Sequence, residues 1–189
     1  MSIHFHKLKI KEIRKETNDC VSISFEIPPE LKDSFSFQHG QNITIKKEIN
    51  GEETRRSYSI CSSPYENELR VAVKKVESGA FSTLANSLLK AGDELEILPP
   101  TGKFNTTLDK NNKKSYFAFA AGSGITPVIS IIKTSLQTEP YSSFTLVYGN
   151  RSRAPIIFFE ELEGLKNKYM NRFNLVHILS REKTDAPIN

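Results

Sequence analysis

The first hundred residues alternate apolar and polar positions with a period of two. The runs that show it include Val21/Ile23/Phe25/Ile27, Ile43/Ile45, Leu69/Val71/Val73 and Leu95/Ile97, with Ile3/Phe5 before them. A period of two is typical of strands that bury one face. Asn50-Gly51 lies between two such runs and predicts a β-hairpin. Proline pairs punctuate the same region at 28–29 and 99–100.

Only residues 81–90 (FSTLANSLLK) have a helical pattern in this half of the chain. Many short strands with one small helix favour a closed or nearly closed antiparallel barrel. We therefore expect an antiparallel β-barrel as a first domain over residues 1–108.

The pattern changes after a polar stretch, residues 109–114 (DKNNKK), which we interpret as a linker. Apolar strands and amphipathic helices then alternate, with strands at 116–121, 144–149 and 173–180 and helices at 127–137 and 155–169. Near-continuous apolar strands separated by helices indicate a parallel sheet. Pro155 at the start of the second helix, with acidic residues before lysines, suits the helix dipole. Residues 115–189 are thus expected to form an α/β nucleotide-binding domain.

Three parallel strands joined by right-handed crossovers carry both helices on one face. The other face, with Phe119, Val147 and Val176, would then lie uncovered. Parallel sheets seldom leave a face open to water. We therefore expect the α/β domain to be truncated and the chain to be part of a longer protein.

Composition and charge exclude several classes of protein. The 189 residues carry a formal charge of +4 without a dense basic block, which argues against a nucleic-acid-binding surface. The N-terminus lacks the apolar core of a signal peptide, and the uncharged residues 115–132 are interrupted by a Gly-Pro loop, which argues against a membrane span. Cys20 and Cys61 are too far apart for a CxxC pair, so no metal site is expected and a reducing, cytoplasmic setting is favoured.

Arg56-Ser57-Tyr58-Ser59 follows the predicted hairpin. On a strand, Arg56 and Tyr58 share one face and Ser59 turns to the other. That face offers a cation for a phosphate and an aromatic plane for a ring. A surface arginine beside a half-buried tyrosine explains the same tetrapeptide.

Gly79-Ala80-Phe81-Ser82 opens the helix of the barrel half. Free N–H groups at a helix start, a glycine that allows close approach and a serine as cap favour an anion site. An ordinary helix cap explains the segment equally.

Residues 121–127 (AGSGITP) join a strand to a helix, where doubly wound sheets bind nucleotides. Gly122 and Gly124 allow a sharp turn, Thr126 can cap the helix and Pro127 can begin it. A tight turn without a ligand is the alternative. Ser180-Arg181, after the third strand, could hold a 2′-phosphate or be an ordinary solvated pair.

These motifs occur in a specific order: RSYS, G-x-F-S, P-x-G-x-F at 100–104, AAGSGITP, YGNR at 148–151 and SRE at 180–182. Over essentially its whole length the chain resembles the ferredoxin–NADP reductase superfamily. Within it, the motifs are similar to those of reductases that serve oxygenases, those of phenylacetate degradation among them. The resemblance implies a six-stranded FAD barrel followed by an NAD(P)H-binding domain.

The resemblance also implies roles for individual residues. Arg56 would hold the FAD pyrophosphate, Tyr58 would lie against the isoalloxazine and Ser59 near flavin N5, and Ser57 between them would also bind the cofactor. The remaining FAD contacts would come from the backbone near Val73 and Lys74 and from Gly79, Phe81 and Ser82. Gly122, Gly124 and Thr126 would line the nicotinamide and its diphosphate, and Ser180 and Arg181 would favour NADPH over NADH. Ser59 and Thr126 would orient hydride transfer, with no acid or base catalyst.

Two features of the resembled family are absent from these residues. There is no Cys-Gly-Pro segment near the nicotinamide, and no C-x4-C-x2-C run for a C-terminal [2Fe–2S] domain. We therefore expect a complete FAD site, an incomplete nucleotide site and a [2Fe–2S] centre only beyond these residues.

The leading hypothesis is a flavoprotein that passes electrons from NADPH through FAD to oxygenase subunits or a ferredoxin. Alternatives are a stand-alone ferredoxin or flavodoxin reductase, and a non-catalytic barrel that binds a nucleotide or a partner protein. The sequence indicates no oligomeric state.

Overall fold

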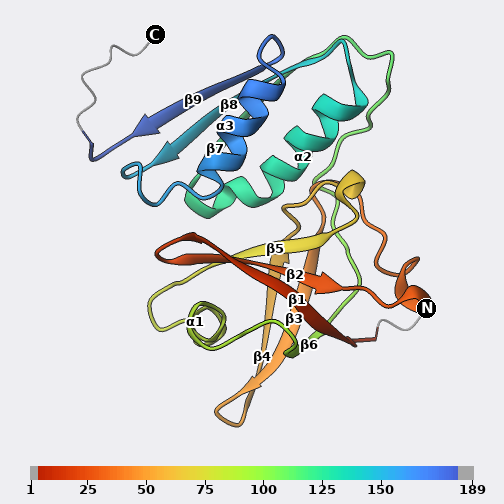
Figure 1. The fold of residues 1–189 in the computed structure, drawn as a ribbon, viewed down its shortest axis with the longest axis vertical. Coiled ribbons are helices and arrows are strands. Elements are labelled where there is room, and N and C mark those ends of the chain that lie inside the picture. Colours follow the sequence, from red (N-terminus) through yellow and green to blue (C-terminus); the bar gives the residue numbers. More distant parts are fainter. Residues whose placement is uncertain (1–3, 183–189) are drawn as a thin grey trace.

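The computed structural model describes residues 4–182. Its first half is one six-stranded antiparallel sheet in the order β4-β3-β6-β1-β2-β5. The strands are β1 His6–Thr17, β2 Cys20–Glu26, β3 Asn42–Ile49, β4 Glu52–Ser59, β5 Leu69–Lys74 and β6 Glu94–Ile97. An antiparallel bridge between Ile60 and Val71 joins the two outer strands, so the sheet curls into a barrel (Figure 1). The predicted barrel is confirmed.

Alternation along the strands fills the barrel interior. Buried apolar side chains meet there from every strand except β4, together with residues of α1, Ala80–Ser87. The hairpin expected at Asn50-Gly51 joins β3 to β4, and both turn residues have positive φ, at 51° and 80°. This is the left-handed backbone that Asn and Gly tolerate and that two-residue hairpins require.

The first strand differs from the expectation. It runs from His6 to Thr17 with Leu8 and Ile10 buried, whereas the alternation pointed to Ile3 and Phe5. Ile3 lies outside the described residues. Leu8 and Ile10 alternate with lysines on the solvent face, so β1 carries the same period of two as the other strands, several residues later than Ile3 and Phe5.

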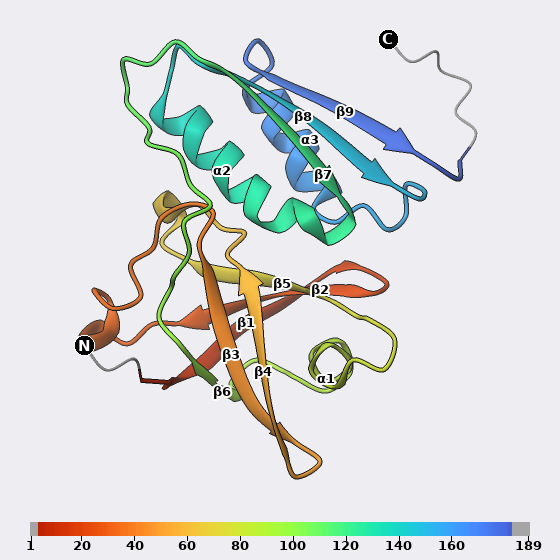
Figure 2. The ribbon, with the colours of Figure 1, turned by 180° about the vertical axis from the view of Figure 1, so that it is seen from behind.

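The second half is a parallel sheet in the order β7-β8-β9, formed by Ser115–Ala121, Ser143–Asn150 and Phe173–Leu179. Helices α2 (Ile125–Thr138) and α3 (Phe159–Lys168) both cover one face of it, as Figures 1 and 2 show. The parallel α/β architecture is confirmed. Short 3₁₀ turns at Pro29–Leu31, Pro64–Glu66 and Gly122–Gly124 complete the elements.

The start of α3 differs from the expectation. Pro155 does not begin the helix, which starts at Phe159 after a left-handed residue, Phe158, with φ of 61°. Ile156, Ile157 and Phe158 are instead buried as a loop. Burial of three apolar side chains outweighs the helix-starting preference of the proline.

The opposite face of the parallel sheet is open among the described residues. Phe119 is 78% exposed and Phe117 69% exposed, while Val147 and Val176 beside them are half-buried. The register aligns Phe119 with Val147 and Val147 with Val176, so these side chains form one apolar row.

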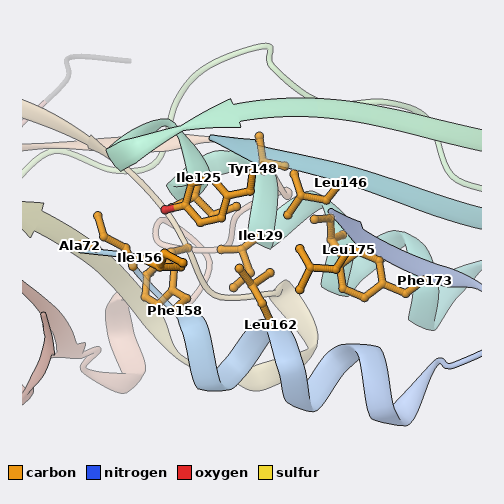
Figure 3. Close-up of a cluster of buried hydrophobic side chains, with 14 of the residues drawn as sticks. Ala72, Ile125, Ile129, Leu146, Tyr148, Ile156, Phe158, Leu162, Phe173 and Leu175 are labelled. Atoms are coloured by element: carbon orange, nitrogen blue, oxygen red, sulfur yellow. The ribbon is translucent and has the colours of Figure 1, made fainter. Parts of the chain in front are cut away.

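A second core lies between the sheet and its helices and reaches the barrel. Ile125, Ile129, Leu146, Tyr148 and Leu162 form its centre, and Figure 3 shows Ala72 of the barrel strand β5 at one end of the same cluster. The two halves therefore share a continuous apolar contact. No helix in residues 4–182 is long and apolar enough to cross a membrane.

Candidate functional site

A hollow of about 340 Å³ lies where the barrel meets the first turn of α2. Its walls come from β4, β5, α1 and the loop before α2. The lining residues are Arg56, Ser57, Tyr58, Ser59, Ala72, Lys74, Val76, Gly79, Ala80, Phe81, Ser82, Ser123 and Thr126. Residues of three separate motifs, assigned from the sequence to FAD and to the nicotinamide, thus face one cavity.

Strand β4 supplies a cation and an aromatic ring. Arg56 is exposed, and its Nη1 donates a hydrogen bond to the backbone oxygen of Arg55 at 2.7 Å. Tyr58 is half-buried with its ring 5.6 Å from the ring of Phe81, and burial raises the pKa of its phenol to about 12. The phenol is therefore neutral at physiological pH. Ser57 shares a hydrogen bond of 2.9 Å with Thr44 on the neighbouring strand.

The start of α1 forms a second wall. Gly79 is the N-cap and no side chain caps the helix, so its first backbone N–H groups are available to an anion. The sequence suggested Ser82 as the cap of this helix, but Gly79 occupies the cap position. Ser82 Oγ accepts a hydrogen bond from Val76 N and donates one to Gly79 O, each at 3.2 Å. The serine therefore closes the turn that precedes the helix.

The structure gives another reason for Gly79. A Cβ at this position would lie 2.4 Å from Ser82 Oγ and 2.5 Å from Val76 Cγ2. The tight turn itself thus requires a glycine, whereas the sequence argument assigned it to the approach of a ligand.

Strand β5 presents Ala72 and Lys74 to the hollow, while the side chain of Val73 is fully buried in the barrel. The backbone oxygen of Val73 accepts a hydrogen bond from Asn86 Nδ2 at 3.0 Å. Val73 is therefore not among the residues that line the hollow. Lys74 Nζ lies 3.5 Å from the carboxylate of Asp19.

The loop before α2 reaches the hollow through Ser123 and Thr126. Thr126 does not cap the helix, because α2 begins at Ile125 with Gly124 as N-cap, and Thr126 Oγ1 donates to Ser123 O at 3.0 Å. Pro127 is accordingly the third helical residue. Gly122 has φ of 50° and accepts a hydrogen bond on its oxygen from the buried Tyr148 hydroxyl at 2.8 Å.

Gly122 and Gly124 lie beside the hollow without lining it, and a Cβ on either would meet no atom within 4 Å. Their backbone is thus open to a ligand from the outside. Ser180 and Arg181 lie elsewhere, beyond β9, where their N–H groups donate to the oxygens of Asn150 and Arg151. They do not line the hollow.

Ala72, Val76, Ala80 and Ser123 are lining residues that the sequence reasoning missed. Ala80 and Ser123 stand inside the motifs at 79–82 and 121–127, and a separate signal existed for Ala72. With Val71 and Val73 assigned to the core, the alternation of β5 directs Ala72 and Lys74 outward.

The residues present fit FAD. The hollow combines an exposed guanidinium, an uncapped helix start for a diphosphate and a neutral aromatic ring for a flavin plane. Within residues 4–182, no group of three His, Cys, Asp or Glu side chains could hold a metal ion.

Comparison with known proteins identifies both halves. Residues 7–106 match the family model described as an oxidoreductase FAD-binding domain, and residues 119–187 match an oxidoreductase NAD-binding domain.

The chain is 44% identical over 184 residues to one of the subunits of 1,2-phenylacetyl-CoA epoxidase from Escherichia coli, covering 97% of this chain and 52% of that protein. It is 39% identical to the ferredoxin reductase component of 3-ketosteroid-9-alpha-monooxygenase from Rhodococcus rhodochrous, covering 91% of this chain and 48% of that protein. The chain thus spans about half the length of these curated relatives.

Among solved structures, phthalate dioxygenase reductase superimposes with a TM-score of 0.73 at 27% identity, covering 96% of this chain and 54% of that one. That reductase is described as a modular structure for electron transfer from pyridine nucleotides to [2Fe–2S].

Proposed function

We propose a function for this chain from its family, the oxidoreductases with FAD-binding and NAD-binding domains of the ferredoxin–NADP reductase type, to which it belongs. In this proposal the chain passes electrons from NADPH through FAD to an iron–sulfur centre that serves an oxygenase. One observation carries the proposal. Residues of the FAD half and of the NAD half line the same hollow, where a flavin and a nicotinamide could meet. The likeness to oxygenase reductases supports the acceptor.

The residues of the chain bind and orient in this proposal. Arg56 and the first turn of α1 hold the diphosphate, and the ring of Tyr58 supports the flavin plane. Ser123 and Thr126 limit the space on the side of α2, so that the nicotinamide approaches in one orientation. When bound, FAD would supply a hydride acceptor for the nicotinamide and a source of single electrons for the acceptor centre.

We propose the substrate of the partner oxygenase from the relative that is 44% identical to this chain. That protein belongs to an epoxidase for phenylacetyl-CoA. We propose the same role here, in the degradation of phenylacetate, with the [2Fe–2S] centre outside these residues.

The visible spectrum and anaerobic mixing test the proposal. The purified chain mixed with FAD should retain it, and NADPH added without oxygen should bleach the flavin absorbance. A chain that retains FAD but is never bleached by NADPH or NADH would favour a binding role. A chain that takes up no FAD would overturn the proposal. Rapid electron transfer to free ferredoxin, without an oxygenase, would favour a stand-alone reductase.

A further inference from the structure

A buried lysine joins the two halves of the molecule. Lys133, on α2, is 7% exposed. Its Nζ lies 3.0 Å from Glu66 Oε2 and 2.8 Å from Glu161 Oε1. Glu66 belongs to the short turn after β4 of the barrel, and Glu161 belongs to α3. One ammonium group therefore bridges the barrel and the α/β half.

The ion pairs of Lys133 with Glu66 and Glu161, which we call the trio, contribute more to the placement of α2 than to the free energy of unfolding. Burying an ammonium group costs free energy, and its two carboxylates mainly offset that cost. Replacing such a group by an apolar side chain often changes stability little, provided the partner charges are removed as well. What the trio supplies is a fixed distance between α2, α3 and the barrel.

Three further contacts follow the same side of α2. Ser130 Oγ donates to the oxygen of Ser62 at 2.7 Å. The hydroxyls of Thr134 and Ser63 lie 3.0 Å apart, as do those of Thr138 and Tyr65. The contacting positions on α2 recur every four residues, so they form one polar stripe against residues 62–66.

The other end of the same helix faces the hollow. Thr126 lies about two turns, or about 10 Å, before Lys133 along α2, and Ser123 lies just before Gly124, the N-cap of the helix. Because a helix moves as a rigid rod, a change of tilt at Lys133 displaces both residues. The contacts that fix the tilt of α2 on residues 62–66 therefore also bear on the position of these two residues at the hollow.

We infer that Lys133 is a positioning residue: its link to Glu66 fixes α2 on the barrel and so sets Ser123 and Thr126 over the flavin hollow. The inference rests on the proposed function for its effect on hydride transfer. Glu161 plays a lesser part, because it lies in the same half as Lys133.

Charge-removing variants of the FAD-loaded chain separate the two links. Glu66→Gln removes the charge at the link to the barrel, while its amide oxygen can still accept the hydrogen bond that Glu66 Oε2 receives from Ser63 N at 2.9 Å. Glu161→Gln removes the charge at the link to α3, and Lys133→Met removes both links. Lys166→Met, an exposed lysine of α3, is the matched control. Two readouts apply: amide hydrogen exchange of residues 122–126, and the limiting rate of anaerobic flavin bleaching at saturating NADPH.

We expect faster exchange at 122–126 in Glu66→Gln and Lys133→Met, with FAD affinity unchanged. The limiting bleaching rate should fall about 10- to 100-fold in both, since small misplacements of reacting groups cost that much. The NADPH concentration for half-maximal rate should not move. The limiting bleaching rate should fall less in Glu161→Gln and should be unchanged in Lys166→Met.

The triple variant Glu66→Gln/Lys133→Met/Glu161→Gln excludes a merely structural role. It leaves no unpaired charge, so we expect its resistance to urea to return while its bleaching rate stays low. If the triple variant recovers both its resistance to urea and its bleaching rate, the inference is overturned. It is also overturned if Glu66→Gln leaves the amide exchange of residues 122–126 and the bleaching rate unchanged. A wild-type flavin that NADPH does not bleach would overturn the proposed function instead. Hydrogen exchange would then still decide whether Lys133 positions the loop.

Discussion

Arg56 is the exposed cation among the residues of β4 that line the hollow, and within residues 4–182 its guanidinium donates a hydrogen bond to the neighbouring backbone oxygen of Arg55. We expect Arg56→Ala to weaken FAD binding by about 1.5–3 kcal/mol, the range for hydrogen bonds to a charged group. The fold should be unaffected, because the side chain is exposed. Titration with FAD, followed by flavin fluorescence, measures the change. The exposed Arg55 next to it serves as control, and equal affinity in Arg56→Ala and wild type would remove Arg56 from the site.

Arg70 gives a prediction for stability against pH. Its buried guanidinium donates hydrogen bonds of 2.9 and 2.7 Å to Glu68, and these bonds lower the pKa of that carboxyl. A carboxyl whose pKa is lower in the folded protein stabilises the fold above its unfolded pKa and loses that effect as pH falls through the folded value.

Glu68→Gln should therefore cost about 1.5–3 kcal/mol at pH 7 and less at about pH 3, because the stabilisation declines progressively below the ordinary pKa of Glu and is gone only below the lowered folded value. Urea unfolding at both pH values, with the exposed Glu30→Gln as control, measures the difference. A cost that is the same at both values would show that the ion pair is not its source.

Single residues also mark the limit of sequence reasoning. The period of β5 places Val73 inside the barrel, as observed, and the same period would have placed Ala72 outside it, although Ala72 is not among the residues assigned above from the sequence. The double hydrogen bonding of Ser82 was not predictable, because it depends on a turn at Val76 whose backbone path no local pattern encodes.

Among the elements, strand β7 exposes apolar side chains on the sheet face that no other described element covers. Phe117 and Phe119 are more than two-thirds exposed there, and exposed apolar surface of this kind promotes association. We expect Phe117→Ser/Phe119→Ser to reduce self-association while leaving the unfolding midpoint nearly unchanged. Sedimentation at several concentrations tests this, with the exposed Tyr141→Ser as control. A fall in stability would mean that both rings pack in solution.

The strands and helices follow from the sequence where apolar spacing is regular, as in β2 and α2. They do not follow from the sequence where the burial of apolar side chains outweighs the local preference of a residue for starting a helix. Pro155 is a good helix start, yet the chain delays α3 to bury Ile156 and Phe158 against the barrel. Such a choice depends on a partner surface that is distant in sequence.

At the scale of the whole molecule, the sequence predicts two halves but not their mutual placement. The motifs for FAD and for the nicotinamide are separated by the barrel helix and a linker, and only the docking of α2 on residues 62–66 brings them to one hollow. That docking uses serine and threonine hydroxyls, which have no distinctive spacing in the sequence.

We expect the preference between NADPH and NADH to depend on the far edge of the parallel sheet. Ser180 and Arg181 follow β9 there, next to Arg151, whose oxygen accepts the N–H of Arg181. An exposed guanidinium at this edge can pair with the 2′-phosphate that distinguishes NADPH.

We expect wild-type flavin to be bleached faster by NADPH than by NADH at equal low concentration. Arg181→Ala should reduce that ratio about tenfold, equivalent to about 1.4 kcal/mol, since one charged contact is lost and NADH never makes it. Anaerobic mixing with both nucleotides measures the ratio, and Lys168→Ala on α3 is the control. The bleaching rate with NADH should be unchanged in Arg181→Ala. A variant that slows with both nucleotides alike would show that Arg181 supports the sheet edge and does not read the phosphate.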